Sequence, residues 1–261
     1  MTEGTRQRPD APLAGAELAL PYLLEDADFA SFARRAASGA TRARASEPLL
    51  AALVAALWTT RAGLEPRGLA VLVGDDDAAR TLAEAAAVYL PGEPVAFMPS
   101  RGAAHGSGLD PAPHLAGERA RALHTLAAGG LVAVSADALV ERLPPPAARA
   151  APVELRIGEE RPFDALTLEL ADAGYERAQT VEERGQFSVR GGLVDVFPST
   201  GREPVRAEFF GDSLERLSAF SVFTQRSLRD LDHVLIHPAA ESAKSVPGTD
   251  FADSAAGWMR T

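Results

Sequence analysis

The sequence contains no cysteine, and this absence removes several kinds of site at once. Disulfide bonds, thiolate zinc centres and a cysteine nucleophile are all excluded for the 261 residues. Lysine is almost as scarce, because Lys244 is the only lysine and every other basic residue among the 26 is arginine. Residues 1–243 therefore contain no lysine that could hold a phosphate or form a Schiff base.

Long apolar runs are also missing, since no segment approaches the roughly 18–20 apolar residues that span a bilayer. The N-terminus lacks the charged-then-apolar pattern of a secretory signal. Acidic residues outnumber basic ones by 36 to 26, which gives a formal net charge of −10. This balance disfavours broad, non-specific nucleic-acid binding. We therefore expect a cytoplasmic protein with no membrane contact and weak or absent binding to duplex DNA.

The residues that are present indicate two folded domains of the α/β class. Residues 1–25 carry prolines and scattered charge and predict a flexible lead-in. From residue 26 onward, helical periodicity and short apolar runs alternate in a way that predicts a parallel sheet covered by helices, ending near residue 150. The expected helices span 26–60, 116–128 and 136–143, with another that follows residues 75–77 and reaches about 90. The expected strands span 68–74, 94–98 and 131–134.

A proline- and alanine-rich stretch at 143–152 marks the predicted domain boundary. Beyond it the sequence pattern becomes one of short strands separated by glycine-rich turns. This pattern predicts a smaller α+β domain with an antiparallel sheet over residues 151–238. Its expected strands are 153–157, 186–190, 193–197, 205–210, 214–223 and 233–237, and its one expected helix is 163–173.

A phosphate site would need a glycine-rich loop between a strand and a helix, followed by a lysine. The stretch Ser38-Gly39-Ala40-Thr41 lacks both the spacing and the lysine. Gly102, Gly106 and Gly108 fall in a proline-containing loop with no helix directly after them. Ordinary turns explain both stretches better than nucleotide binding, so we expect no cofactor site.

The sequence gives equally little support for a metal site or a catalytic nucleophile. Asp75, Asp76 and Asp77 follow a strand and could hold Mg²⁺ or a ribose, but capping of the next helix explains them more simply. His233 and His237 have the spacing of a helical ligand pair, yet the sequence between them is strand-like. No nucleophile motif is present. We expect no catalytic residue and no metal ligand, and therefore a chain that is not itself an enzyme.

The densest pattern lies in residues 175–210, where Arg177, Arg184 and Arg190 bring three guanidinium groups within 14 residues. Two interpretations of these arginines are equally supported by composition. They either pair with neighbouring carboxylates on a solvated surface or form an anchor surface for an acidic partner, because arginine binds carboxylates well and is enriched in interface hot spots.

The sequence YERAQTVEERGQFSVRGGLVDVFP, continued by PVRAEFFGDSLERLSAFSVFTQRSL, resembles the UvrA-binding module shared by bacterial transcription-repair coupling factors (Mfd) and the excinuclease component UvrB. A weaker resemblance to the first domain of that family extends upstream to about residue 45. QRSL and the following HVLIHPAAE are closer to the coupling factor. The resemblance implies a degenerate P-loop-type domain at 26–150, a UvrA-binding-like domain at 151–238, and the truncated start of a return segment to the first domain at 239–261.

The function implied by this resemblance is recruitment. Coupling factors bring the excinuclease component UvrA to RNA polymerase stalled at DNA damage, for nucleotide excision repair. Contacts with RNA polymerase and DNA, and the motor with its ATP and Mg²⁺, would lie in downstream domains that this chain does not include. By motif position, Arg177 and Arg190 are the principal expected contacts with UvrA. Arg184, Phe187 and Phe197 are secondary, and UvrB often has another arginine where this chain has Ser188.

The alternative is a fragment of a UvrB-like excinuclease component with an ATP-dependent role in damage verification. UvrB keeps a complete phosphate-binding loop, whereas this sequence has none. The missing lysine therefore favours the coupling factor, and we expect residues 1–261 to bind neither ATP nor ADP.

Overall fold

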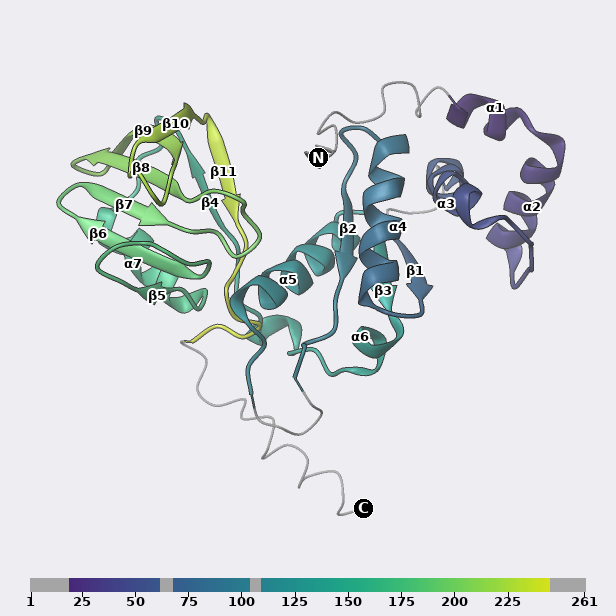
Figure 1. Ribbon diagram of the computed structural model, residues 1–261, viewed down its shortest axis with the longest axis horizontal. Helices are drawn as coiled ribbons and strands as arrows, with labels where there is room; N and C mark the ends of the chain where they lie inside the picture. The colour runs from purple at the N-terminus through teal and green to yellow at the C-terminus, as the bar shows by residue number, and fades with distance from the viewer. Residues whose placement is uncertain (1–18, 62–67, 104–108, 245–261) are drawn as a thin grey trace, which may run out of the picture.

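A parallel sheet and separate antiparallel sheets make up two modules in a computed structural model that describes residues 19–61, 68–103 and 109–244. Figure 1 shows the modules next to each other, with the helix α5 (Pro113–Ala127) running from one toward the other. The predicted combination of a parallel sheet with an antiparallel one is therefore confirmed.

The first module is built on three parallel strands in the order β1 (Leu69–Val73), β3 (Leu131–Ser135) and β2 (Val95–Met98). All of β3 is buried, because it lies between the other two strands and has helices on both faces. A strand enclosed in this way is nearly continuously apolar, and only Ser135 at the end of β3 is polar. This burial explains the continuous run LVAV that predicted the strand.

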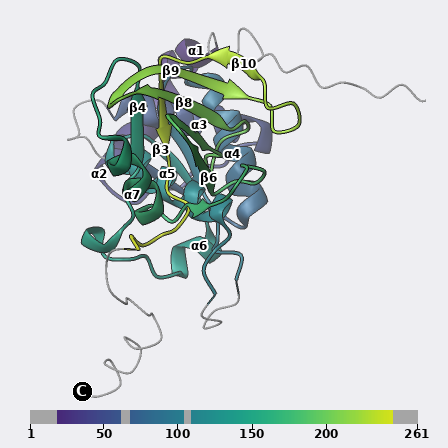
Figure 2. The ribbon, with the colours of Figure 1, turned by 90° about the vertical axis from the view of Figure 1, so that its left-hand side faces the viewer.

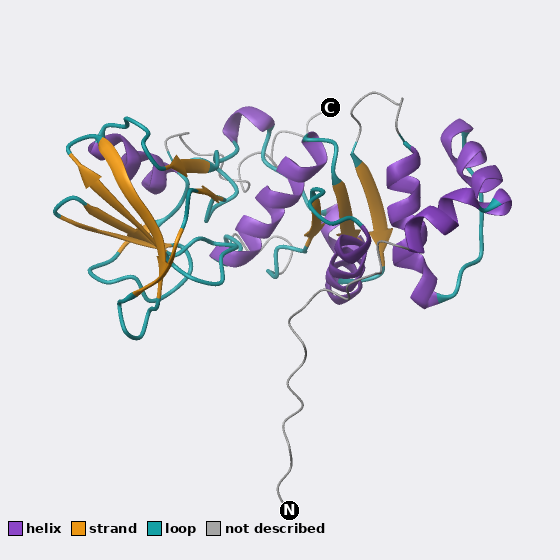
Figure 3. Cartoon of the chain, turned by 90° about the horizontal axis from the view of Figure 1, so that it is seen from above, coloured by secondary structure: helices purple, strands orange, loops and turns teal. Residues whose placement is uncertain are grey.

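Two layers of helices enclose this sheet (Figure 3). Helices α3 (Glu47–Thr60) and α4 (Asp76–Tyr89) share one core with alternate strand residues, and α5 and α6 (Ala136–Val140) share another core with the intervening residues. Ser135 caps α6 as predicted, since its hydroxyl accepts a hydrogen bond from the Ala138 amide at 3.1 Å.

Two further helices, α1 (Ala19–Glu25) and α2 (Ala27–Ser38), precede α3. The carboxylate of Asp26 accepts a hydrogen bond from the Phe29 amide at 2.8 Å and so caps α2. Residues 19–25 of the predicted flexible lead-in are thus helical, and residues 1–18 lie outside the described residues. The predicted helical stretch 26–60 is two helices, because the chain turns at Gly39.

A six-stranded sheet dominates the second module and is antiparallel except for its last pair, β6 and β5. Strands β5 and β10 were not predicted, because β5 has only two residues and all of β10 is exposed and mostly polar. The sheet order is β10 (Ser227–Asp230), β9 (Ser213–Phe220), β8 (Val205–Phe210), β7 (Leu193–Val196), β6 (Gln186–Arg190) and β5 (Glu176–Arg177).

One face of this sheet packs against the helix α7 (Phe163–Asp172) and a two-stranded sheet of β4 (Val153–Arg156) and β11 (His233–Ile236). Figure 2 shows the module from its own side, with β8 and β9 in front. The shared core is made mainly of aliphatic side chains, and Leu155, Leu166 and Leu170 are completely buried in it. We call the opposite side of the sheet the outer face.

The two modules meet along α5, and their closest approach is at Gly117. A Cβ atom added at Gly117 would overlap Oγ of Ser199, so only glycine fits there. The hydroxyl of Ser199 donates a hydrogen bond to the His237 carbonyl at 2.9 Å, and the Tyr175 hydroxyl donates to the same carbonyl at 2.6 Å. Burial raises the pKa of Tyr175 to about 12, so this donor keeps its proton.

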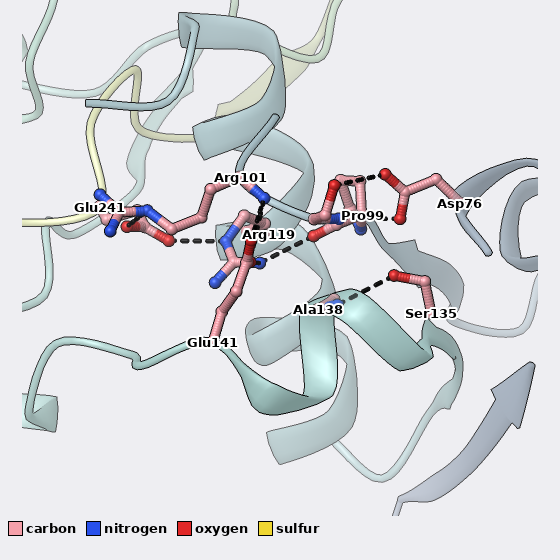
Figure 4. A network of polar contacts seen from close by, with 9 residues as sticks. Asp76, Pro99, Arg101, Arg119, Ser135, Ala138, Glu141 and Glu241 are labelled. Carbon is pink, nitrogen blue, oxygen red and sulfur yellow. Dashed lines mark hydrogen bonds and ion pairs between the residues drawn. The ribbon is translucent and has the colours of Figure 1, made fainter. Parts of the chain in front are cut away.

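A buried arginine links the modules through hydrogen bonds and ion pairs (Figure 4). Arg119 on α5 is 1% exposed, and its Nε donates to Glu241, which follows the second module, at 2.6 Å. Its Nη1 donates to the Pro99 carbonyl and to Glu141, both at 2.8 Å. Arg101 completes the group, because its amide donates to Glu141 and its Nε lies 3.1 Å from Glu241.

We predict that Arg119→Met lowers the free energy of unfolding by ~3–5 kcal/mol, because it removes the ion pair of Glu141 and leaves Glu241 with Arg101 alone. Arg121→Met is a matched control on the same helix. Its ion pair with Glu118 is partly exposed, and its loss should cost less than ~1 kcal/mol. Urea unfolding of both variants measures the difference. Equal losses would show that the junction does not depend on Arg119.

Candidate docking surface

The outer face of the six-stranded sheet carries a row of charged side chains. Cross-strand pairing aligns Ser188 with Asp195 and Asp195 with Arg206, so all three point to the same side. Asp195 is 1% exposed and accepts hydrogen bonds from Nη2 of Arg190 at 2.7 Å and from Nε and Nη2 of Arg206 at 2.7 and 2.9 Å. The negative charge of Asp195 is therefore paired with two guanidinium groups.

The two arginines at Asp195 differ in burial. Only 14% of the Arg206 side chain is exposed, and its guanidinium lies 4.6 Å from the centre of the Phe220 ring. The hydrogen bonds to Asp195 raise the pKa of Arg206 further, despite partial burial. In contrast, 48% of the Arg190 side chain is exposed. Arg206 therefore neutralises Asp195 from within the module, whereas Arg190 presents donors to solvent.

Arg177 does not lie on the outer face. It pairs with Phe187 across the short parallel ladder between β5 and β6, and Phe187 points into the core. Arg190 is three residues further along β6 and so points to the opposite side. Arg177 is exposed only because β5 is the free edge of the sheet among the described residues. The structure thus places the two principal predicted contacts on opposite sides of that edge.

The secondary candidates Arg184, Phe187 and Phe197 also differ in their exposure to solvent. Arg184 is exposed, donates to the Gly201 carbonyl at 2.8 Å and lies 5.9 Å from the centre of the half-buried Phe197 ring. Phe187 is 3% exposed and packs in the core of the second module. We therefore correct the assignment of Phe187, because a side chain buried in the core cannot touch a partner.

An exposed aromatic residue that was not predicted as a contact, Phe223, lies beside this face. Phe223 is 98% exposed in the turn 221–226, whose first three residues were predicted to belong to the strand 214–223. Gln225 adopts a left-handed conformation with φ of 57°, its side chain donates to the Val222 carbonyl, and its own carbonyl accepts from Arg206 at 3.3 Å. A fixed turn next to the charged row therefore holds Phe223 in solvent.

The acidic cluster after β1 is structural. Asp75 caps α4 by accepting from the Ala78 amide at 2.8 Å. Asp76 accepts from the amide and hydroxyl of Ser100 at 2.9 and 2.7 Å. Burial raises the pKa of Asp76, but hydrogen bonds from Ser135 and Ser100 and the charge of Arg119 outweigh it, so the net pKa is lowered. These carboxylates occupy the helix N-terminus where a phosphate would otherwise bind.

The histidine pair is split between two environments. His233 is exposed on β11, while His237 is buried at the junction. Burial, with smaller contributions from Arg121 and His124, lowers the pKa of His237 to about 4, so it is neutral at pH 7. No cluster of three or more metal-ligating side chains occurs within residues 19–61, 68–103 and 109–244. The predicted loop residues Gly106 and Gly108 lie outside the described residues.

Comparison with known proteins identifies the class of the second module. Residues 153–241 match the UvrB interaction domain. This range begins at β4 and ends at Glu241, the residue that pairs with Arg119, so it coincides with the second module and its exit.

Similarity to individual proteins extends over more of the chain. The chain is 33% identical over 193 residues to the transcription-repair-coupling factor of Mycobacterium tuberculosis. The match covers 61% of this chain and 16% of that protein. The chain is 32% identical over 132 residues to the coupling factor of Bacillus subtilis (49% and 11%), and 35% identical over 91 residues to the UvrABC system protein B of Helicobacter pylori (34% and 14%). The resemblance to the N-terminal region of the coupling factors is confirmed, and the chain spans at most about 16% of these relatives. Of the described helices, none has the length and apolar character to cross a membrane.

We predict that the two arginines at Asp195 contribute unequally to stability. Arg206→Ala should lower the free energy of unfolding by ~2–4 kcal/mol, because it removes two hydrogen bonds from a buried carboxylate. Arg190→Ala should lower it by less than ~1 kcal/mol, because Arg206 still holds Asp195. Urea unfolding of both variants tests this order. A larger loss for Arg190→Ala would make Arg190 a structural residue and remove it from the docking surface.

Proposed function

We propose that this chain is a non-catalytic recruitment module in the cytoplasm, whose second module docks the excinuclease component UvrA and brings it to RNA polymerase stalled at DNA damage. One observation carries the proposal. Within a domain that matches the UvrB interaction domain, Arg190 is half exposed, while the carboxylate that it shares is already neutralised by Arg206. We assign no contact with RNA polymerase or DNA and no ATP-driven motor to residues 1–261.

The chemistry of the face fits an acidic partner. A guanidinium has five N–H donors, and Asp195 takes only one hydrogen bond from Arg190. The remaining donors can form a bidentate pair with a carboxylate of the partner. Because Arg206 already neutralises Asp195, the charge of Arg190 is available to a partner while its hydrogen bond to Asp195 is kept.

The geometry adds a constraint on how UvrA docks. Arg177 and Arg190 point to opposite sides of the sheet at its β5 edge. A partner that contacts both must lie across this edge. A partner that lies flat on the outer face would contact Arg190 and Phe223 but would leave Arg177 free.

We predict that Arg190→Ala weakens binding of UvrA by roughly 30- to 1000-fold, which corresponds to ~2–4 kcal/mol for a desolvated anchor. Calorimetric titration of residues 1–261 with purified UvrA measures the affinity, and melting curves show whether the variant is folded. Arg156→Ala is the matched control. Arg156 is an exposed arginine on β4 with one carboxylate partner, and its loss should change the affinity less than threefold.

The same titration with Arg177→Ala and Phe223→Ala distinguishes the two docking modes. A loss of about tenfold or more for Arg177→Ala supports docking across the edge, and a loss confined to Arg190→Ala and Phe223→Ala supports docking on the outer face alone. Unchanged affinity in all three folded variants would refute the site.

We further propose that residues 1–261 supply no ATP site. The stretch 38–41 connects two helices instead of a strand and a helix, and Asp75 occupies the N-terminus of α4. Calorimetric titration with ATP and Mg²⁺ should therefore show no binding up to about 1 mM, because a phosphate would meet neither a lysine nor free amides. Micromolar binding that requires Mg²⁺ would revive the interpretation as a UvrB-like excinuclease component.

A further inference from the structure

A cavity of about 210 Å³ lies at the junction of the two modules, away from the docking surface. One wall is α5, another is the linker between the modules, and the third is the segment after β11. We call it the junction cavity. Its apolar walls include Leu123, Ala127, Leu143, Pro144 and Pro152.

Apart from Oε2 of Glu241, which lies 3.1 Å from Nε of Arg101, two buried polar atoms of the lining residues have no hydrogen-bond partner among the described residues. They are Nη2 of Arg119, which is 1% exposed, and Nδ1 of His237, which is 7% exposed. Figure 4 shows Arg119 with its other two guanidinium nitrogens engaged and Nη2 left over. A buried donor without a partner costs about 1–3 kcal/mol, so such atoms mark a place where a polar ligand would be stabilised.

The charges around the cavity favour an anion. Glu141 and Glu241 are balanced by Arg101 and Arg119. Arg149 also lines the cavity, and only its Nε has a partner, the Pro144 carbonyl at 2.9 Å. No carboxylate among the described residues pairs with it, which leaves one uncompensated positive charge.

We propose that the junction cavity binds a small organic monocarboxylate, with the carboxylate at the guanidinium groups of Arg149 and Arg119 and the hydrocarbon body against the apolar walls. The volume equals that of about seven water molecules, so a ligand of about seven to ten non-hydrogen atoms fits. This site is independent of the docking of UvrA. Because its walls come from both modules, an occupied cavity stabilises the two in contact with each other.

Hexanoate is a suitable probe, because it has one carboxylate and a short apolar chain. Calorimetric titration of residues 1–261 should give a Kd of about 0.1–1 mM, the range expected for a ligand of this size. Acetate, which lacks the apolar body, and hexanamide, which lacks the charge, should each bind at least tenfold more weakly. N-acetyl-leucine, a mimic of a peptide carboxyl terminus that exceeds the cavity, should also bind more weakly.

Two variants test the location. Ala120→Leu fills the cavity from the half-buried side of α5 without removing a polar group, and it should abolish binding of hexanoate. Arg149→Gln removes the uncompensated charge and should weaken binding about tenfold. Ala87→Leu, at an exposed position of α4 outside the cavity, is the matched control and should bind normally. If Ala120→Leu does not fold, Arg149→Gln decides the outcome.

Three results would overturn the proposal. They are the absence of saturable hexanoate binding up to about 10 mM, equal affinity for hexanamide, and unchanged affinity in folded Ala120→Leu or Arg149→Gln. Tighter binding of N-acetyl-leucine than of hexanoate would also overturn it, because the occupant would then be a peptide terminus.

Discussion

The buried guanidinium of Arg119 is the constraint on which the junction depends. A charge at 1% exposure is tolerated only with counter-charges and hydrogen bonds around it. Arg119 obtains them from the end of β2, from the end of α6 and from the segment after the second module. These three segments therefore meet at α5, on the same helix that carries the close contact between Gly117 and Ser199.

The same pairing of arginine with carboxylate has a different role on the outer face because exposure differs. Asp195 is as deeply buried as Arg119, but one of its two arginines reaches solvent. Arg206 supplies the structural half of the arrangement and Arg190 the accessible half. A lone exposed arginine would be mobile, whereas one hydrogen-bonded to a buried carboxylate loses less conformational entropy when it binds a partner.

Local patterns predicted the elements that depend on local physics. The apolar run at Leu131, the hydroxyl of Ser135 at a helix start and the aspartate at 75 were sufficient, because strands enclosed on both faces and helix caps involve neighbouring residues. Arg119 gave no signal within its predicted helix. Its partners Glu141 and Glu241 lie 22 and 122 residues away, and only the folded chain brings them together.

The arginines of the candidate site show that proximity in sequence was insufficient to predict which side chains share a face of the sheet. Arg177 and Arg190 are close along the chain, but the register of a two-residue strand decides which side each faces, and no periodicity can be read from two residues. That strand is also the edge of the sheet, where unpaired backbone groups invite association with other chains. Glu176 and Arg177 are both exposed there, and charged side chains on an edge oppose non-specific pairing of strands. An edge protected in this way stays open to a partner that supplies complementary charge, which links the position of β5 to docking across it.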